Sequence, residues 1–311
     1  MSIDKNKAVS VDRLVVKFGD FVAVNNISFH VDRGEIFGFL GANGAGKTTS
    51  IRVICGLLKP TSGEVAVGGE TFMGNGDNLK KKVGYMSQRF TLYDDLTVSE
   101  NLQFTASLRK LDKKYFESRK AFLLDFIKFD YSQNLFVREL SGGIKQQVAL
   151  VAAILHDPEV IFLDEPTAGV TPVSRALFWS LIEKLAKDGK TVFVTSHYMD
   201  EVEQCDRIAM MRAGEIIALD HPEGLKSTYF PNGIYQLTAK EAVSIEDFKQ
   251  RILATGEVES FQPHGIHYHL SPVNAQSWQK LSSYVLPQFE AKKINASLED
   301  VFIKLVEGKN R

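Results

Sequence analysis

The sequence contains little cysteine and no long hydrophobic run. Cys55 and Cys205 are the two cysteines among 311 residues, and their spacing matches neither a metal-ligand nor a redox motif. Isolated cysteines of this kind indicate small buried side chains in a reducing compartment. The longest apolar run, 148–155, is far shorter than the roughly 18 residues of a spanning helix. The N-terminal segment lacks the apolar stretch of a signal peptide, so we expect a cytosolic chain to which other subunits would supply any membrane span.

The sequence also lacks an excess of charge of one sign. Lysine and arginine total 37 and aspartate and glutamate total 38, which gives a formal net charge of −1. This balance gives no reason to expect a nucleic-acid partner and provides no polybasic membrane anchor. The length suggests roughly two domains, because one core rarely serves more than about 250 residues.

The segment GANGAGKT at 41–48 has the spacing of a phosphate-binding loop. We expect a buried strand before it at 35–40 and a helix after it at 49–58. In that setting the glycines bring backbone N–H groups to a polyphosphate, and the positive end of the helix faces the same anion. Lys47 is expected to reach the β- and γ-phosphates of a nucleoside triphosphate, and Thr48 to coordinate Mg²⁺. The candidate nucleotide-binding residues of this segment are Gly41, Asn43, Gly44, Ala45, Gly46, Lys47, Thr48 and Thr49.

Two carboxylates, Asp164 and Glu165, end the apolar run VIFLD that begins at residue 160. Burying two negative charges there is costly unless a cation compensates them. A Mg²⁺ ion near Thr48 would supply that charge, with Asp164 as its direct or second-sphere ligand. Glu165 is then expected to orient and deprotonate an attacking water. The alternative is a pair of solvated acids at the end of a surface strand.

The order of the expected elements indicates an α/β fold. Residues 11–18 and 23–31 are strand-like, and from residue 40 onward strands alternate with helices. The runs at 160–164 and 191–195 have the continuous apolar composition of buried parallel strands. Helical periodicity over 97–130 predicts a helical insert, and we interpret its aromatic stripe as core rather than as a cofactor site.

Turn residues at 221–232 mark a boundary. Beyond it we expect strands at 234–239, 257–262, 265–270 and 288–294 and helices at 245–254, 274–284 and 297–307. We therefore assign 1–225 to a nucleotide-binding domain and 226–311 to a small accessory α+β domain of split βαβ type. His264, His267 and His269 suggest a metal site, but the alternation of His267 and His269 with apolar residues favours the solvent-facing side of a strand.

Residues 140–146, LSGGIKQ, resemble the LSGGQ signature of ATP-binding-cassette (ABC) ATPases. Three further positions resemble motifs of that family. Gln88 is placed like its Q-loop glutamine, His197 like its switch histidine, and Phe18 like the aromatic residue that stacks on adenine. Taken singly, each has an ordinary alternative as a core or solvated residue, but together they extend the resemblance over residues 10–225.

The resemblance implies the family's fold and ligands. The fold is a P-loop ATPase core with an antiparallel β subdomain and a helical subdomain at about 89–156. The ligands are ATP and Mg²⁺, with Gln88 joining Thr48 and Asp164 at the metal. Two ATPase protomers, identical or homologous, enclose two nucleotides, so Ser141, Gly142 and Gly143 of one protomer would bind the γ-phosphate held by the other. A helix N-terminus after Ser141 suits such an anion site.

A finer resemblance points to the drug-resistance (daunorubicin-type) exporter branch. It rests on the run at 84–102, the LSGG-x-KQ form of the signature, and SLEDVF at 297–302. ATPases of that branch pair with separate ABC-type membrane permeases. The resemblance therefore implies efflux of a small hydrophobic or amphipathic compound, with this chain on the cytoplasmic face of the inner (plasma) membrane. Phe90, Leu92 and Tyr93 are candidates for a docking surface, with subdomain core as the alternative.

Two positions depart from the family pattern. Ile144 replaces the glutamine of the signature, which removes one polar side chain from the site in the facing protomer. Thr171 stands where the family usually has an aspartate that couples the two sites. We predict weakened coupling rather than lost hydrolysis, because the expected catalytic residues Glu165 and His197 are both present.

Two other functions compete with that of a transport ATPase. A non-transport ABC ATPase acting on ribosomes or DNA usually carries two cassettes or a long coiled-coil insertion, and this sequence shows one cassette without such an insertion. A regulatory or binding subunit with weak turnover is motivated by Thr171 and Ile144. Phosphate release from ATP, and its loss in Glu165→Gln, separates a transport ATPase from a regulatory subunit.

Overall fold

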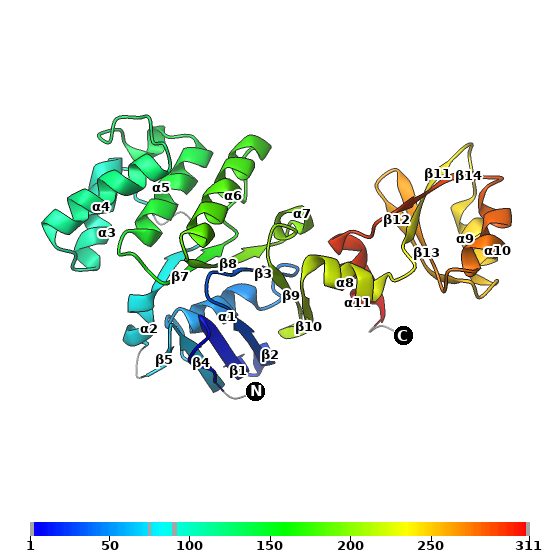
Figure 1. The fold of residues 1–311 in the computed structure, drawn as a ribbon, viewed down its shortest axis with the longest axis horizontal. Coiled ribbons are helices and arrows are strands. Elements are labelled where there is room, and N and C mark those ends of the chain that lie inside the picture. The colour runs from blue at the N-terminus through cyan, green and yellow to red at the C-terminus, as the bar shows by residue number, and fades with distance from the viewer. Residues whose placement is uncertain (1–2, 74–75, 89–91, 309–311) are drawn as a thin grey trace. The chain divides into compact units, whose positions relative to one another are not determined.

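The computed structural model describes residues 3–73, 76–88 and 92–308 (Figure 1). The chain divides into two compact units, Met1–Leu219 and Asp220–Arg311. The boundary expected after residue 225 falls inside helix α8 (Pro222–Tyr229), so the second unit starts just before that helix rather than within a loop. The assignment of the two parts as functional domains stays a prediction.

A six-stranded sheet in the order β10-β9-β3-β8-β7-β6 lies at the centre of the first unit. Its strands are β3 (Ile36–Leu40), β6 (Val83–Met86), β7 (Val160–Asp164), β8 (Thr191–Ser196), β9 (Arg207–Arg212) and β10 (Glu215–Asp220). The five strands from β9 to β6 pair in parallel. Every residue of β3, β7 and β8 is buried, which confirms the parallel α/β sheet expected from their apolar composition.

A second, antiparallel sheet has the order β2-β1-β4-β5. Its strands are β1 (Val9–Phe18), β2 (Phe21–Val31), β4 (Ser62–Val67) and β5 (Glu70–Thr71). Phe29 of β2 contacts Phe37 of β3 and Phe193 of β8, at ring-centroid distances of 5.6 and 6.2 Å. These buried rings join the two sheets into one hydrophobic core.

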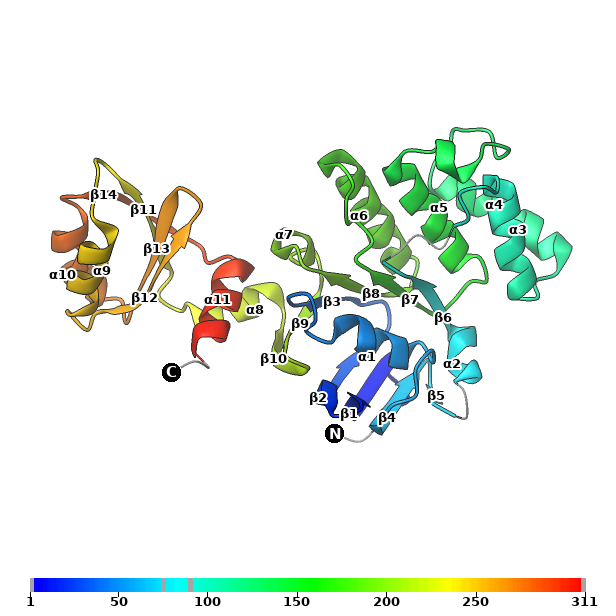
Figure 2. The same cartoon turned by 180° about the vertical axis from the view of Figure 1, so that it is seen from behind.

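Helices α5 and α6 lie on one side of the parallel sheet, whereas α1 lies on the other side, beside the antiparallel sheet (Figures 1 and 2). The helices and helical turns of this unit are α1 (Lys47–Ile54), α2 (Asp77–Lys82), α3 (Val98–Leu108), α4 (Lys113–Phe126), η1 (Val137–Glu139), α5 (Gly142–Ile154), α6 (Pro172–Lys187) and α7 (Met199–Val202). The expected helical insert is confirmed by α3 and α4, but its aromatic residues are only partly core. Phe116 is buried, whereas Tyr115 and Phe122 are 43% and 55% exposed, because α4 turns a different face toward its neighbours.

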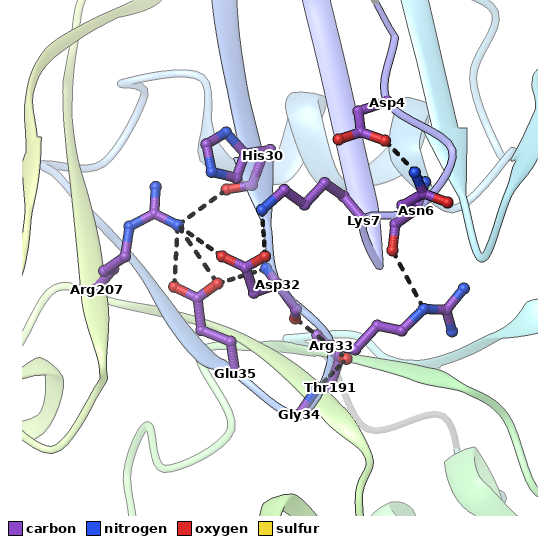
Figure 3. Close-up of polar contacts among 10 residues, drawn as sticks. All are labelled: Asp4, Asn6, Lys7, His30, Asp32, Arg33, Gly34, Glu35, Thr191 and Arg207. Atoms are coloured by element: carbon purple, nitrogen blue, oxygen red, sulfur yellow. Dashed lines mark hydrogen bonds and ion pairs between the residues drawn. The ribbon is translucent and has the colours of Figure 1, made fainter.

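The loop between β2 and β3 is anchored by polar contacts (Figure 3). Arg207 of β9 contacts Glu35 at 3.2 Å, and Gly34 N donates to Thr191 Oγ1 of β8 at 3.0 Å. Burial raises the pKa of the Glu35 carboxyl, although the Arg207 guanidinium opposes that shift. These contacts fix the start of β3, the strand that leads into the glycine-rich loop.

The second unit contains a four-stranded antiparallel sheet in the order β12-β13-β11-β14. Its elements after α8 are β11 (Ile234–Ala239), α9 (Ile245–Leu253), β12 (Val258–His264), β13 (His267–Pro272), α10 (Ser277–Val285), β14 (Phe289–Ile294) and α11 (Leu298–Gly308). Leu237, Phe248, Phe261 and Phe289 lie in its own hydrophobic core. All seven elements expected here are present, whereas α8 lies where turn residues had indicated only a boundary.

The solvent-facing position expected for His269 is wrong. His269 is only 6% exposed, because Asp300 of α11 contacts its imidazole ring and α11 covers this part of β13. His267 remains partly exposed and contacts Thr238 Oγ1 through Nδ1 at 2.9 Å.

Among the described helices, none combines the length and the apolar character that crossing a membrane requires.

Candidate functional site

The glycine-rich loop lies between β3 and α1, where a parallel strand leads into a helix N-terminus. Gly44 and Gly46 have φ angles of 80° and 105°, which favour glycine over other residues. A Cβ atom on Gly46 would lie 2.6 Å from Ala23 O, and one on Gly41 would lie 2.3 Å from Met211 O. The loop conformation therefore depends on glycine, and the loop leads directly into the N-terminus of α1, where an anion can bind.

Lys47 lies across this loop. Its Nζ donates to Gly41 O at 2.7 Å and to Ala42 O at 3.2 Å, and it lies 3.9 Å from Glu165 Oε1. Burial lowers the pKa of Lys47, while Glu165 and Asp164 oppose the shift. A polyphosphate in the loop would replace neutral carbonyl partners with oxyanions, which are stronger acceptors for this buried cation.

Asp164 and Thr48 face each other from β7 and α1. Thr48 Oγ1 lies 3.3 Å from Asp164 Oδ1, which also accepts a hydrogen bond from Thr195 Oγ1 at 2.7 Å. Tyr85 of β6 lies 3.4 Å from the other carboxylate oxygen. A buried carboxylate beside a hydroxyl forms an oxygen donor set, which suits Mg²⁺ better than softer cations. The sequence pattern did not identify Thr195 or Tyr85, although both lie at strand ends beside β7.

Glu165 is held by two side chains that the sequence had indicated separately. Gln88 Nε2 donates to Glu165 Oε2 at 2.7 Å, and His197 Nδ1 lies 3.3 Å from the same oxygen. The backbone of Glu165 has φ of 50°, a left-handed conformation that costs a non-glycine residue about 1–3 kcal/mol. Its N–H donates to Thr195 Oγ1 at 2.9 Å, which helps to hold this conformation. The carboxylate is thus fixed at the end of β7, within reach of the loop.

A cavity of about 430 Å³ opens over the loop. Its lining includes most of the expected nucleotide-binding residues: Phe18, Asn43, Gly44, Ala45, Gly46, Lys47, Thr48, Thr49, Gln88 and Glu165. Phe21 also lines it and was missed, because it belongs to no sequence motif. Phe18 and Phe21 are 53% and 64% exposed, so both rings are open to stack on a planar base.

The signature residues Ser141, Gly142 and Gly143 do not line this cavity within the described part of the chain. Ser141 is the N-cap residue of α5 without a side-chain capping bond, and both it and Gly142 are exposed. The start of α5 therefore presents its orphan N–H groups to solvent. This geometry leaves the signature open to an anion held by another molecule.

Glu201 of α7 contacts residues of three other segments, and no sequence motif had indicated it. It is 1% exposed and accepts hydrogen bonds from Thr167 Oγ1 at 2.5 Å and Ser196 Oγ at 2.6 Å. Arg175 Nε of α6 lies 3.1 Å from the same carboxylate. Arg175 also lies over the ring of Tyr198, which packs against His197 at 4.1 Å. Glu201 therefore ties the segment after Glu165 to the segment that carries His197.

We expect Glu201→Ala to lower the turnover number for ATP while the KM for ATP changes little. The substitution leaves Arg175 without its buried partner, and breaking such a pair costs about 3 kcal/mol of stability. ATPase kinetics and urea denaturation measure the two effects. Asp200→Ala is the matched control. Asp200 is exposed, and this substitution removes its 3.6 Å ion pair with Arg175 but leaves Glu201 in place. Equal turnover numbers for Glu201→Ala and the wild type would contradict a positioning role.

Comparisons with known proteins agree with this geometry. Residues 24–168 match the family model described as ABC transporter. The probable multidrug ABC transporter ATP-binding protein YbhF of Escherichia coli (strain K12) is 42% identical over 224 residues, which cover 70% of this chain and 38% of YbhF. This chain thus matches well under half the length of that relative. The linearmycin resistance ATP-binding protein LnrL of Bacillus subtilis (strain 168) is 34% identical over 93% of this chain and 94% of its own length.

A solved structure extends the comparison to the fold. The dimeric post-hydrolysis state of an ATP-binding cassette bound to ADP and Pi superimposes with a TM-score of 0.62. It is 27% identical in sequence and covers 68% of this chain and 98% of the other. Together with the loop, the paired carboxylates and the signature, these likenesses show that the chain belongs to the ABC transporter family as one of its ATP-binding subunits.

Proposed function

We propose that this chain hydrolyses Mg-ATP and thereby energises export of a small hydrophobic or amphipathic compound through separate membrane permease subunits. The observation that carries the proposal is the fixed position of Glu165 between Gln88 and His197, close to Lys47. A buried acid at the edge of a phosphate-binding loop is placed to act on water rather than only to stabilise the fold.

The roles of the residues follow from their positions. The backbone of the loop and Lys47 bind the phosphates, and Phe18 stacks on adenine. Thr48 and Asp164, with Gln88 nearby, would hold a Mg²⁺ ion, which would supply positive charge against the β- and γ-phosphates. Glu165 orients the attacking water and accepts its proton, and His197 stabilises that arrangement.

The site is completed by a second ATPase protomer, identical or homologous. Ser141, Gly142 and Gly143 of that protomer bind the γ-phosphate, as the exposed start of α5 allows. Hydrolysis removes this link, so ATP and ADP favour different states of the dimer. Thr171 caps α6 through Ser174 N at 3.3 Å and carries no charge toward the facing site, which supports weakened coupling.

A groove on the helical side of the first unit is the proposed contact with the permease. It has a volume of about 660 Å³ and is lined by Tyr85, Leu92, Tyr93, Phe104, Thr105, Leu108, Arg109, Ala152 and Ala153. Leu92 and Tyr93 had been candidates for such a surface, and Phe90, the third candidate, lies outside the described residues. Tyr93 and Leu108 are large and exposed, which suits an apolar helix of the permease at the cytoplasmic face of the membrane.

Cross-linking in cells tests the groove. A cysteine in place of Leu108 should cross-link to a polytopic membrane protein, whereas Phe122→Cys on α4 should not. Phe122 is a matched control because it is also a large, exposed hydrophobic residue but does not line the groove. Cys55 and Cys205 are buried, so they should not compete for the cross-linker. Equal cross-linking at both positions would contradict the proposed contact.

Efflux from the same cells tests the activity. Cells lacking the protein should accumulate a fluorescent hydrophobic compound, and the wild-type chain but not Glu165→Gln should restore its efflux. Restoration by both chains would contradict a transport role for hydrolysis.

A further inference from the structure

Three side chains from separate elements of the second unit meet in a cluster that the proposed ATPase function does not use. His264 ends β12, His269 lies in β13, and Asp300 lies in the first turn of α11. Each offers one potential metal ligand, and these atoms all lie within 4.8 Å of one another. The two imidazole rings stack with centroids 4.1 Å apart and an interplanar angle of 11°.

Asp300 fixes the orientation of His269. Its Oδ1 lies 2.7 Å from His269 Nδ1, and its Oδ2 accepts from Ser297 N and Ser297 Oγ at 2.8 and 2.7 Å. Both oxygens of Asp300 are engaged as acceptors, so Nδ1 is the nitrogen of His269 that donates to the carboxylate, and Nε2 is the nitrogen that carries the lone pair.

That lone pair has no partner. His269 Nε2 is buried and makes no hydrogen bond within the described part of the chain, although the ring is more than nine-tenths buried. Buried polar atoms are normally paired. A carboxylate that binds one ring nitrogen while the other stays available is the arrangement found behind histidines that bind metals.

His264 can supply the second ligand. Its side chain is 34% exposed, and its Nδ1 lies 3.9 Å from Glu299 Oε2. Two nitrogens bound to one zinc ion lie at most about 4.2 Å apart, because each Zn–N bond is about 2.0–2.1 Å long. Because the stacked rings are nearly parallel, the ring of His264 must turn out of the stack before both nitrogens can face one ion, and its partial exposure leaves room for that turn.

We propose that His264 and His269 bind a divalent transition-metal ion of the zinc class, with Asp300 orienting His269. Imidazole nitrogens favour such ions over Mg²⁺ and Ca²⁺, so this site is chemically distinct from the one beside Thr48. The bound ion links β12 to β13 within the hairpin and stabilises the second unit. His267 is excluded, because it contacts Thr238 on β11 instead.

Titration of the full-length protein with Co²⁺ and Zn²⁺ tests the site. The titration uses protein without a polyhistidine tag and without nucleotide, in buffer that contains excess Mg²⁺. We expect Co²⁺ absorption bands of an ordered imidazole site, and calorimetry should give one Zn²⁺ ion per chain. His264→Ala should weaken binding at least about ten-fold, and Asp300→Asn should weaken it about 10–100-fold. His267→Ala, the matched control from the same hairpin, should bind as the wild type does.

Thermal unfolding gives an independent readout. Zn²⁺ should raise the melting temperature of the wild type and of His267→Ala but not that of His264→Ala. His264 is partly exposed and outside the capping contacts of α11, so this variant is expected to fold even where Asp300→Asn does not. Absence of Co²⁺ bands in the wild type, or equal weakening by His264→Ala and His267→Ala, would overturn the proposal. Neither readout depends on ATP turnover, so failure here is distinct from failure of the ATPase function.

Discussion

Glu165→Gln is expected to reduce ATP turnover by about 10²–10⁴-fold, the usual contribution of a general base. The amide keeps the size of the side chain but cannot accept the proton of the attacking water. Gln88 and His197 hold the native carboxylate at 2.7 and 3.3 Å, so the loss should affect chemistry rather than position. Phosphate release measures turnover, and light scattering or sedimentation measures the dimer, which ATP should still induce.

Glu183→Gln is the matched control for this substitution. Glu183 is a surface residue of α6 whose only contact described here is an ion pair with Lys187 at 3.7 Å, and such pairs contribute little. Its turnover should equal that of the wild type. If the wild type and Glu165→Gln release phosphate equally slowly, the chain is a regulatory or binding subunit and the catalytic assignment is wrong.

Gly142→Arg should abolish ATP-induced dimerisation and lower turnover by at least about 100-fold, while ATP still binds the monomer. A Cβ atom on Gly142 meets no other atom within 4 Å, so the fold tolerates the larger side chain. The arginine would instead occupy the space where the nucleotide of a second protomer should approach the N-terminus of α5. Removing donors that act on developing charge costs about 10²–10³-fold in rate. Fluorescent ATP analogues measure binding separately from turnover.

Asn134→Arg provides the control for added charge, because Asn134 is an exposed loop residue of the same helical region. It should dimerise and turn over ATP as the wild type does. Loss of ATP binding by monomeric Gly142→Arg would contradict a site shared between protomers, since Gly142 does not line the cavity of its own loop.

Much of the site could be expected from short stretches of the chain. The loop at 41–48, the acids at 164–165 and the signature at 140–146 each combine a local pattern with a strand end or a helix start. Such patterns are readable because turn chemistry and periodicity act over a few residues. The parallel sheet then brings Glu165, which follows β7, beside His197, which follows β8, since neighbouring parallel strands end at the same edge.

Other contacts could not be expected from the sequence. Glu201 follows His197 by four residues, but its hydrogen bond with Thr167 and its ion pair with Arg175 depend on the packing of α6 and α7. Alternation along β13 suggested a solvated His269, because the pattern of one strand says nothing of a helix that later covers it. The contact of Phe21 with the nucleotide-binding cavity could not be predicted, because Phe21 belongs to no sequence motif.

The sequence by itself determined the α/β class, the order of the elements, the nucleotide-binding loop and the resemblance to ABC ATPases, because these depend on periodicity and on motifs of a few residues. Tertiary structure alone decided which side chains meet across elements. It joined Gln88, Glu165 and His197, buried Glu201 against Thr167, Ser196 and Arg175, and selected His264 and His269 rather than His267 to meet Asp300. Those meetings arise from packing between residues distant in the chain, where burial fixes the partners that local patterns leave open.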